Sequence, residues 1–192
     1  YAATAVDAST LTEVSNSNNP FESLSGKIAG VQINIEPLPS GDENFLLLLD
    51  ELRLALPEGK LISIAAYPPP TRWQPSLDVH WEEEFFKEVA KRVEQMVPMM
   101  YDTSIIIEKP YIKLIESWTE EVLVWSGDTQ VLLGIPGYAD EGVGYHHPEV
   151  ENIESALKGI HQGLSGKKGL GSNYAGIAIY SEWTMTPERW EQ

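Results

Sequence analysis

The sequence predicts an α/β protein in which about five or six parallel strands alternate with helices, either as part of a (β/α)8 barrel or as an open doubly wound sheet. Three observations lead to this prediction. Strand-like and helix-like segments alternate along most of the chain, the strand-like segments are largely apolar on both faces, and no tight hairpin turn joins them. Strand-like segments also begin roughly every 30 to 45 residues, a spacing typical of βα units.

The first elements are clear from their patterns. Residues 31–37 alternate apolar and polar side chains, which predicts a strand. The helix predicted over 43–56 has a wide apolar face and ends at Pro57 and Gly59. The next strand, over 60–68, stops at a run of prolines.

The later elements continue this alternation. The helix over 81–95 has acidic residues in its first turn and basic residues later, as the helix dipole favours. A short apolar strand follows over 96–102, and the helix over 110–127 begins with Pro and ends with Gly. The remaining predicted elements are a strand over 129–138, a helix over 147–166, a strand over 174–183 and a helix that begins at 186.

The composition favours a neutral ligand. The chain has 29 acidic and 13 basic residues, for a formal net charge of -16. We therefore expect no nucleic acid and no membrane as partners, because both anionic surfaces need Lys and Arg patches. A carbohydrate fits this charge better. Cys is absent, so there is no thiol nucleophile and no Cys-based metal site.

No metal ion and no organic cofactor is predicted. His146 and His147 have no partner four residues away and no carboxylate at metal-ligand spacing, so we interpret them as loop residues. His80 and His161 stand alone and are interpreted as packing or surface residues. The Gly-rich stretch 163–176 precedes a strand, whereas a dinucleotide-binding loop follows one.

Four successive predicted strands end in a tyrosine, namely Tyr67, Tyr101, Tyr138 and Tyr180. Ligands in parallel α/β folds lie at the carboxyl ends of the strands. One such Tyr is ordinary, because Tyr favours strands and tolerates a half-exposed position. Four at equivalent positions predict a shared aromatic-lined pocket, which suits a sugar.

The first strand carries a polar row. Residues two apart on a strand face the same way, so Gln32, Asn34 and Glu36 share one face while the apolar residues between them pack on helices. In a barrel this row would point at the axis. We expect the Glu36 carboxyl to be partly desolvated at the rim, as a general acid requires. The alternative is a polar layer that only hydrogen-bonds within itself.

The segments GVQINIEP, MMYD, LLGIPGY and AIYSEW, in this order on successive strands, resemble the second half of family-18 glycoside hydrolases, the chitinase-like (β/α)8 barrels. The resemblance implies that residues 30–183 supply strands four to eight. It also implies that 1–192 is a single domain, the C-terminal portion of a barrel that lacks its first strands. Such a piece has an open edge, so the missing N-terminal half or another chain is an expected partner.

The resemblance also implies roles for individual residues. Glu36 lies at the position of the general acid/base, and Tyr101 and Asp102 at positions that hold the N-acetyl group. The implied mechanism is substrate-assisted: the acetamide oxygen attacks the anomeric carbon while Glu36 protonates the leaving oxygen. The resemblance implies that Met99, Tyr138 and Trp183 bind substrate, and the polar row and the strand-end tyrosines add Gln32, Tyr67 and Tyr180 to the expected substrate-binding residues.

One departure from the family pattern affects the activity. Asn34 stands where the family has an Asp that polarises the acetamide, and a neutral amide cannot offset a positive oxazolinium. Related endo-N-acetylglucosaminidases resemble this arrangement, with Asn-x-Glu on the same strand. Three interpretations stay open: a glycosidase for N-acetylglucosamine-containing glycans, a weak or inactive carbohydrate-binding relative, and an α/β domain of unrelated function. We also expect a secreted or extracellular protein.

Overall fold

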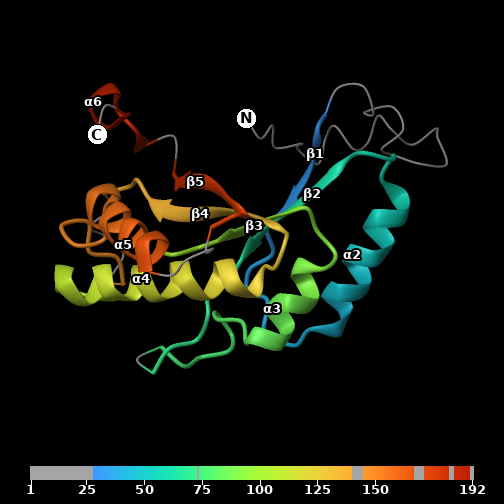
Figure 1. Cartoon of the computed structure of the whole chain (residues 1–192), viewed down its shortest axis with the longest axis horizontal. Coiled ribbons are helices and arrows are strands. Elements are labelled where there is room, and N and C mark those ends of the chain that lie inside the picture. The colour runs from blue at the N-terminus through green and yellow to red at the C-terminus, as the bar shows by residue number, and fades with distance from the viewer. Residues whose placement is uncertain (1–27, 73, 140–144, 167–170, 182–183, 191–192) are drawn as a thin grey trace.

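A computed structural model describes residues 28–72, 74–139, 145–166, 171–181 and 184–190 (Figure 1). The strands are β1 (Gly30–Ile33), β2 (Leu61–Ala66), β3 (Gln95–Pro98), β4 (Gln130–Pro136) and β5 (Tyr174–Tyr180). The helices are α2 (Glu43–Ala55), α3 (Glu83–Ala90), α4 (Glu108–Trp125), α5 (Ile153–Gly166) and the short α6 (Pro187–Trp190). The predicted alternation of strands and helices is confirmed.

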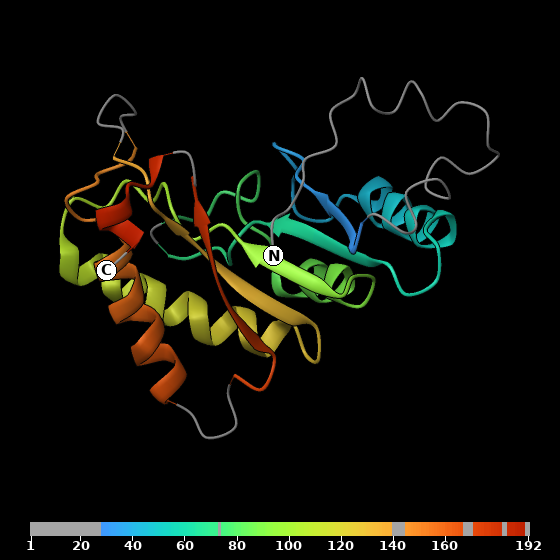
Figure 2. The same ribbon diagram turned by 90° about the horizontal axis from the view of Figure 1, so that it is seen from above.

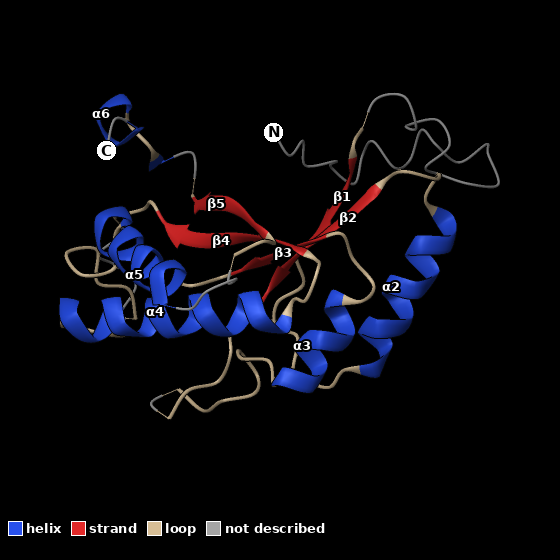
Figure 3. Ribbon diagram, in the orientation of Figure 1, coloured by secondary structure: helices blue, strands red, loops and turns tan. Residues whose placement is uncertain are grey.

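The strands form one parallel sheet in the order β1-β2-β3-β4-β5 (Figure 2). Helices α2 to α5 lie on the same side of this sheet (Figure 3). A doubly wound sheet reverses its strand order and carries helices on both faces. Sequential order with helices on one face is the arrangement of a (β/α)8 barrel, so the described residues form a partial barrel-like fold.

Local signals fix where several elements begin. The Asp42 side chain accepts a 3.1 Å hydrogen bond from the backbone N of Phe45, which caps α2. Helix α3 begins with Glu83 and Glu84, whose charges favour a helix N-terminus. Strand β1 ends at Ile33, earlier than the alternating pattern over 31–37 predicts, because it lies at the sheet edge and pairs with β2 alone.

The hydrophobic core lies between the sheet and its helices. Fully buried side chains come from the sheet (Ile62, Ile64, Met96, Leu133, Ile135) and from the helices (Phe86, Tyr111, Ile115, Trp118). Burying one such large apolar side chain stabilises the fold by roughly 1.5–3 kcal/mol. Gly159 lets α5 approach α4 closely, since a Cβ at Gly159 would lie 2.7 Å from the Ile112 carbonyl oxygen.

A polar row crosses the sheet face that is turned away from α2 to α5. The strand register places Gln32 beside Ser63, Ser63 beside Gln95, and Gln95 beside Gln130. The Ser63 hydroxyl donates a 2.9 Å hydrogen bond to Gln95 Oε1. Gln32 thus belongs to a polar layer that extends across four strands.

No helix among the described residues has the length and apolar character that a membrane crossing requires. The carboxyl ends of all five parallel strands lie along one edge of the sheet. Segments that are far apart in the sequence therefore meet at this edge.

Candidate functional site

The candidate site lies at the carboxyl edge of the sheet, as the sequence predicts. Asn34 and Glu36 come directly after β1, and Tyr67 directly follows β2. Asp102 follows β3, and Tyr138 follows β4. Parallel strands deliver these segments to one rim because their carboxyl ends are adjacent.

Asn34 and Glu36 form a direct pair. Asn34 Nδ2 donates a 2.8 Å hydrogen bond to Glu36 Oε1, as expected for residues two apart on one face of an extended segment. Both side chains are exposed, so the expectation of a desolvated Glu36 is wrong for the described part of the chain. Ile35 is also 40% exposed instead of packed under a helix, because regular pairing of β1 ends at Ile33.

Three of the four predicted rim tyrosines come together. The rings of Tyr101 and Tyr180 stack with centroids 5.2 Å apart and planes 10° apart. The Tyr138 ring lies edge-on to both, 6.3 Å from Tyr101 and 5.6 Å from Tyr180. Tyr180 is 46% exposed, so the group presents aromatic surface at the rim. The CH face of a sugar stacks on surfaces of this kind.

Tyr67 has its ring contact with Trp81 and packs edge-on against it, with ring centroids 6.1 Å apart. Burial raises the pKa of Tyr67, and the negative charge of Glu36 raises it further. Tyr67 and Glu36 are therefore electrostatic neighbours across β1 and β2.

The charge of Glu36 also reaches the residues that follow β3. Burial is the main cause that raises the pKa of Tyr101, and Glu36 is the largest of the charges that raise it further. The pKa of Asp102 is raised chiefly by burial, with a smaller contribution from Glu36 that opposes the hydrogen bond from Tyr138. These couplings put Glu36, Tyr101 and Asp102 in one electrostatic neighbourhood.

Asp102 is held in an uncommon backbone conformation. Its φ of 59° lies in the left-handed region, which few residues other than Gly adopt. The Tyr138 hydroxyl donates a hydrogen bond to Asp102 Oδ1. This contact joins the loop after β3 to the loop after β4 and orients the carboxylate at the rim.

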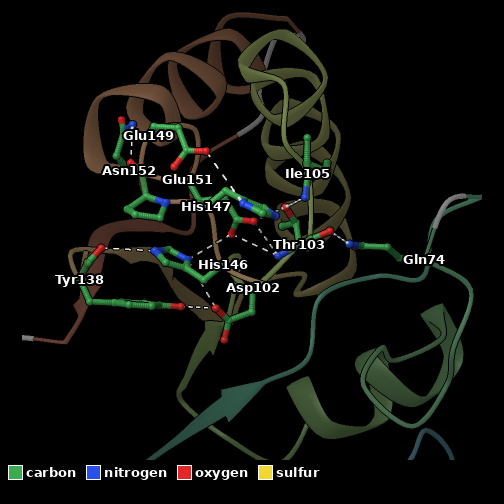
Figure 4. A network of polar contacts seen from close by, with 11 residues as sticks. Gln74, Asp102, Thr103, Ile105, Tyr138, His146, His147, Glu149, Glu151 and Asn152 are labelled. Carbon is green, nitrogen blue, oxygen red and sulfur yellow. Dashed lines mark hydrogen bonds and ion pairs between the residues drawn. The ribbon is translucent and has the colours of Figure 1, made fainter. Parts of the chain in front are cut away.

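Two further residues, His146 and Glu151, join this region from the segment between β4 and α5 (Figure 4). The His146 ring stacks on the Tyr138 ring with centroids 4.0 Å apart, and its Nδ1 lies 3.6 Å from Asp102 Oδ1. The buried Glu151 carboxylate accepts hydrogen bonds from the backbone N and the hydroxyl of Thr103. Burial raises the pKa of Glu151, and these hydrogen bonds oppose that shift.

Sequence reasoning missed His146 and Glu151. His146 lies in a loop, as interpreted, but its side chain is buried and its Nδ1 lies 3.6 Å from each of two carboxylates, which was not expected. Its acidic neighbours are five residues along the chain and forty-four residues back, so no local spacing motif appears. Their position in the chain could have indicated a role in the site, because His146 and Glu151 lie in the segment that follows the carboxyl end of β4.

Three predicted substrate-binding residues lie elsewhere or outside the described residues. Gln32 lies within β1, whereas Glu36 lies beyond the end of that strand. Met99 is 9% exposed and packs in the hydrophobic core below Tyr101. Trp183, the expected aromatic floor, lies outside the described residues.

The sequence matches no family model and no curated protein. Among solved structures, it is similar to the spore cortex-lytic enzyme SleL of Bacillus cereus, with a TM-score of 0.39 and 19% identity over 56% of this chain and 25% of that one. The same enzyme of Bacillus megaterium QM B1551 gives a TM-score of 0.41 and 17% identity over 62% of this chain and 30% of that one. The chain thus spans less than a third of either enzyme. Similarity at this level establishes neither a family nor an activity.

Proposed function

We propose that the protein is a glycoside hydrolase that cleaves glycans containing N-acetylglucosamine, such as chitin-like chains, N-glycans or peptidoglycan. The observation that carries this proposal is the Asn34–Glu36 pair at the end of β1, electrostatically coupled to Tyr101 and Asp102 after β3. A carboxyl group beside aromatic and hydrogen-bonding side chains has the components that glycosidic bond cleavage needs.

The proposed reaction is substrate-assisted and retaining. The acetamide oxygen of the sugar attacks the anomeric carbon while the glycosidic C–O bond breaks, and Glu36 gives its proton to the leaving oxygen. The Glu36 carboxylate then takes a proton from water as that water opens the oxazolinium ring. This sequence restores Glu36 and keeps the anomeric configuration.

The neighbouring groups position the acetamide. Asn34 uses Nδ2 for Glu36, which leaves its amide oxygen to accept the acetamide N–H. The raised pKa of Tyr101 keeps its phenol protonated, so the hydroxyl donates to the acetamide oxygen. Asp102 is oriented by Tyr138, and the exposed Tyr180 ring offers a face for stacking.

A second candidate function is carbohydrate binding with little or no turnover. Two observations favour it: Asn34 is neutral where a charged carboxylate would stabilise the oxazolinium, and the Glu36 side chain is exposed. Losing one electrostatic partner of a developing charge costs about 3 kcal/mol in the barrier. The aromatic group formed by Tyr101, Tyr138 and Tyr180 would serve binding equally well.

An experiment that mixes the intact protein with N-acetylglucosamine oligomers and with peptidoglycan fragments distinguishes these two functions. Calorimetry measures binding, and mass spectrometry measures cleavage. The hydrolase proposal predicts both for the wild type, and binding without cleavage for Glu36→Gln. Binding without cleavage in both proteins would support the binder, and absence of binding in both would contradict both functions.

A further inference from the structure

We propose that Asp102, His146 and Glu151 form a binding site for a divalent transition-metal ion, of which Zn²⁺ is the best-fitting example. One potential ligand atom from each residue lies within 4.8 Å of the other two. His146 Nδ1 is 3.6 Å from Asp102 Oδ1 and 3.6 Å from Glu151 Oε2. Two ligands bound at about 2.1 Å with angles of 109–120° lie about 3.4–3.6 Å apart, so the nitrogen-to-oxygen spacings fit.

The orientation of the His146 ring supplies the second, independent observation. His146 Nε2 lies 3.3 Å from the carbonyl oxygen of Tyr138, which only accepts, so Nε2 carries the hydrogen. In the neutral ring, Nδ1 then carries the lone pair, and Figure 4 shows the contacts that run from His146 to the neighbouring carboxylates. Metal-bound histidines characteristically donate their other ring N–H to a backbone carbonyl in this way.

This Nδ1 atom is buried and has no hydrogen-bond partner among the described residues. The His146 side chain is 0% exposed, and Nδ1 faces the two carboxylates. A lone pair that faces two carboxylates from a buried side chain is unfavourable. A cation between the three groups converts this repulsion into attraction, which explains why the atom lacks a partner.

The carboxylates are also held as metal ligands usually are. Thr103 fixes Glu151 through its backbone N, 3.1 Å from Oε1, and through its hydroxyl, 2.8 Å from the same oxygen. Tyr138 fixes Asp102 through its hydroxyl. One imidazole nitrogen with two carboxylate oxygens is a donor set that suits Zn²⁺ or Mn²⁺.

The site is reachable from the rim. The Asp102 side chain is 34% exposed, whereas those of His146 and Glu151 are fully buried. An ion would therefore enter past Asp102 and keep an open coordination position on that side for water or a substrate oxygen. Asp102 is shared with the proposed glycan site, but metal binding does not depend on turnover of a glycan.

The test is calorimetry of the intact, EDTA-treated protein with ZnCl₂ and, separately, MnCl₂. The proposal predicts one ion per chain with a dissociation constant in about the micromolar range or tighter, and a higher melting temperature when the ion is present. Asp102→Asn and Glu151→Gln should each weaken binding at least about tenfold. The matched control His147→Gln changes the adjacent histidine outside the cluster and should bind as the wild type does.

Asp102→Asn keeps the test decisive if the buried Glu151→Gln variant does not fold, because Asp102 is partly exposed. Absence of binding to the folded wild type would overturn the proposal, as would equal binding by wild type and Asp102→Asn. So would nitrogen NMR that shows both His146 nitrogens protonated in the presence of excess Zn²⁺, because an imidazolium would then neutralise the carboxylates. None of these three results depends on cleavage of a glycan, so the metal-site proposal and the glycosidase proposal can fail separately.

Discussion

Asn34 Nδ2 donates a 2.8 Å hydrogen bond to Glu36 Oε1 at the point where β1 leaves the sheet. The bond orients a carboxylate that is electrostatically coupled to both Tyr67 and Tyr101. It uses one of the two N–H donors of the Asn34 amide, and the amide oxygen that remains as an acceptor is neutral. The pair therefore holds Glu36 in place but supplies no negative charge of its own.

We predict that Asn34→Asp raises turnover of N-acetylglucosamine oligomers by about a hundredfold, because a carboxylate stabilises the positive oxazolinium by about 3 kcal/mol relative to a neutral amide. Steady-state kinetics measures this change in kcat. Asn44→Asp makes the same chemical change at an exposed position on α2 and should leave kcat unaltered. An unchanged or lower kcat in Asn34→Asp would remove the acetamide-polarising role from this position.

Tyr101→Phe should lower kcat/KM about fivefold while the fold stays intact. The substitution deletes a hydroxyl worth about 1 kcal/mol in a neutral hydrogen bond but keeps the ring that stacks on Tyr180. Kinetics and circular dichroism together check this result. Tyr174→Phe is the control, because Tyr174 begins β5, whereas Tyr180, which stacks on Tyr101, ends it. Equal kinetics for Tyr101→Phe and the wild type would show that the hydroxyl does not contact the substrate.

His80 predicts a pH dependence of stability. Burial lowers the pKa of His80 below its ordinary value of 6.5, against a smaller opposing effect of the Ser76 carbonyl. Between the pKa of the folded state and 6.5, His80 is protonated in the unfolded chain but neutral in the folded chain. The free energy of unfolding therefore falls as the pH drops from 6.5 toward the pKa of the folded state. Denaturant unfolding between about pH 5 and 8 should show a flatter profile for His80→Gln. The exposed His161→Gln is the control, and a profile for His80→Gln as steep as that of the wild type would contradict the assignment.

Gly159→Ala should destabilise the protein by about 1–3 kcal/mol, because overpacking forces shifts in a close helix contact. The new Cβ would lie 2.7 Å from the Ile112 carbonyl oxygen and 2.7 Å from Ile115 Cβ, both on α4. Gly166→Ala on the same helix meets only the end of the flexible Glu120 side chain at 2.8 Å and should cost far less. Equal denaturation midpoints would show that α4 and α5 separate freely.

The sequence predicted the fold well because apolar alternation and helix caps are local signals. The strands of the sheet, their parallel direction and the convergence of Tyr101, Tyr138 and Tyr180 all followed from such patterns. The exposure of Ile35 did not follow, since alternation alone does not tell where an edge strand stops pairing.

The grouping of Asp102, His146 and Glu151 could not be predicted from the sequence, for a different reason. Its three residues come from the loops after β3 and β4, and they meet only when those strands are adjacent. Long-range contacts of this kind leave no spacing motif in a single sequence. The left-handed backbone of Asp102, which aims its carboxylate, is likewise set by the tertiary structure.

The most direct test of the central claim compares Glu36→Gln with the wild type on two β-N-acetylglucosaminides, one with a sugar leaving group and one with an activated aryl leaving group. A general acid matters most when the leaving group is poor. We predict that Glu36→Gln lowers kcat at least about a hundredfold on the sugar substrate and much less on the aryl substrate. Equal effects on both substrates, or unchanged turnover of the sugar substrate, would contradict the role of Glu36 as the acid.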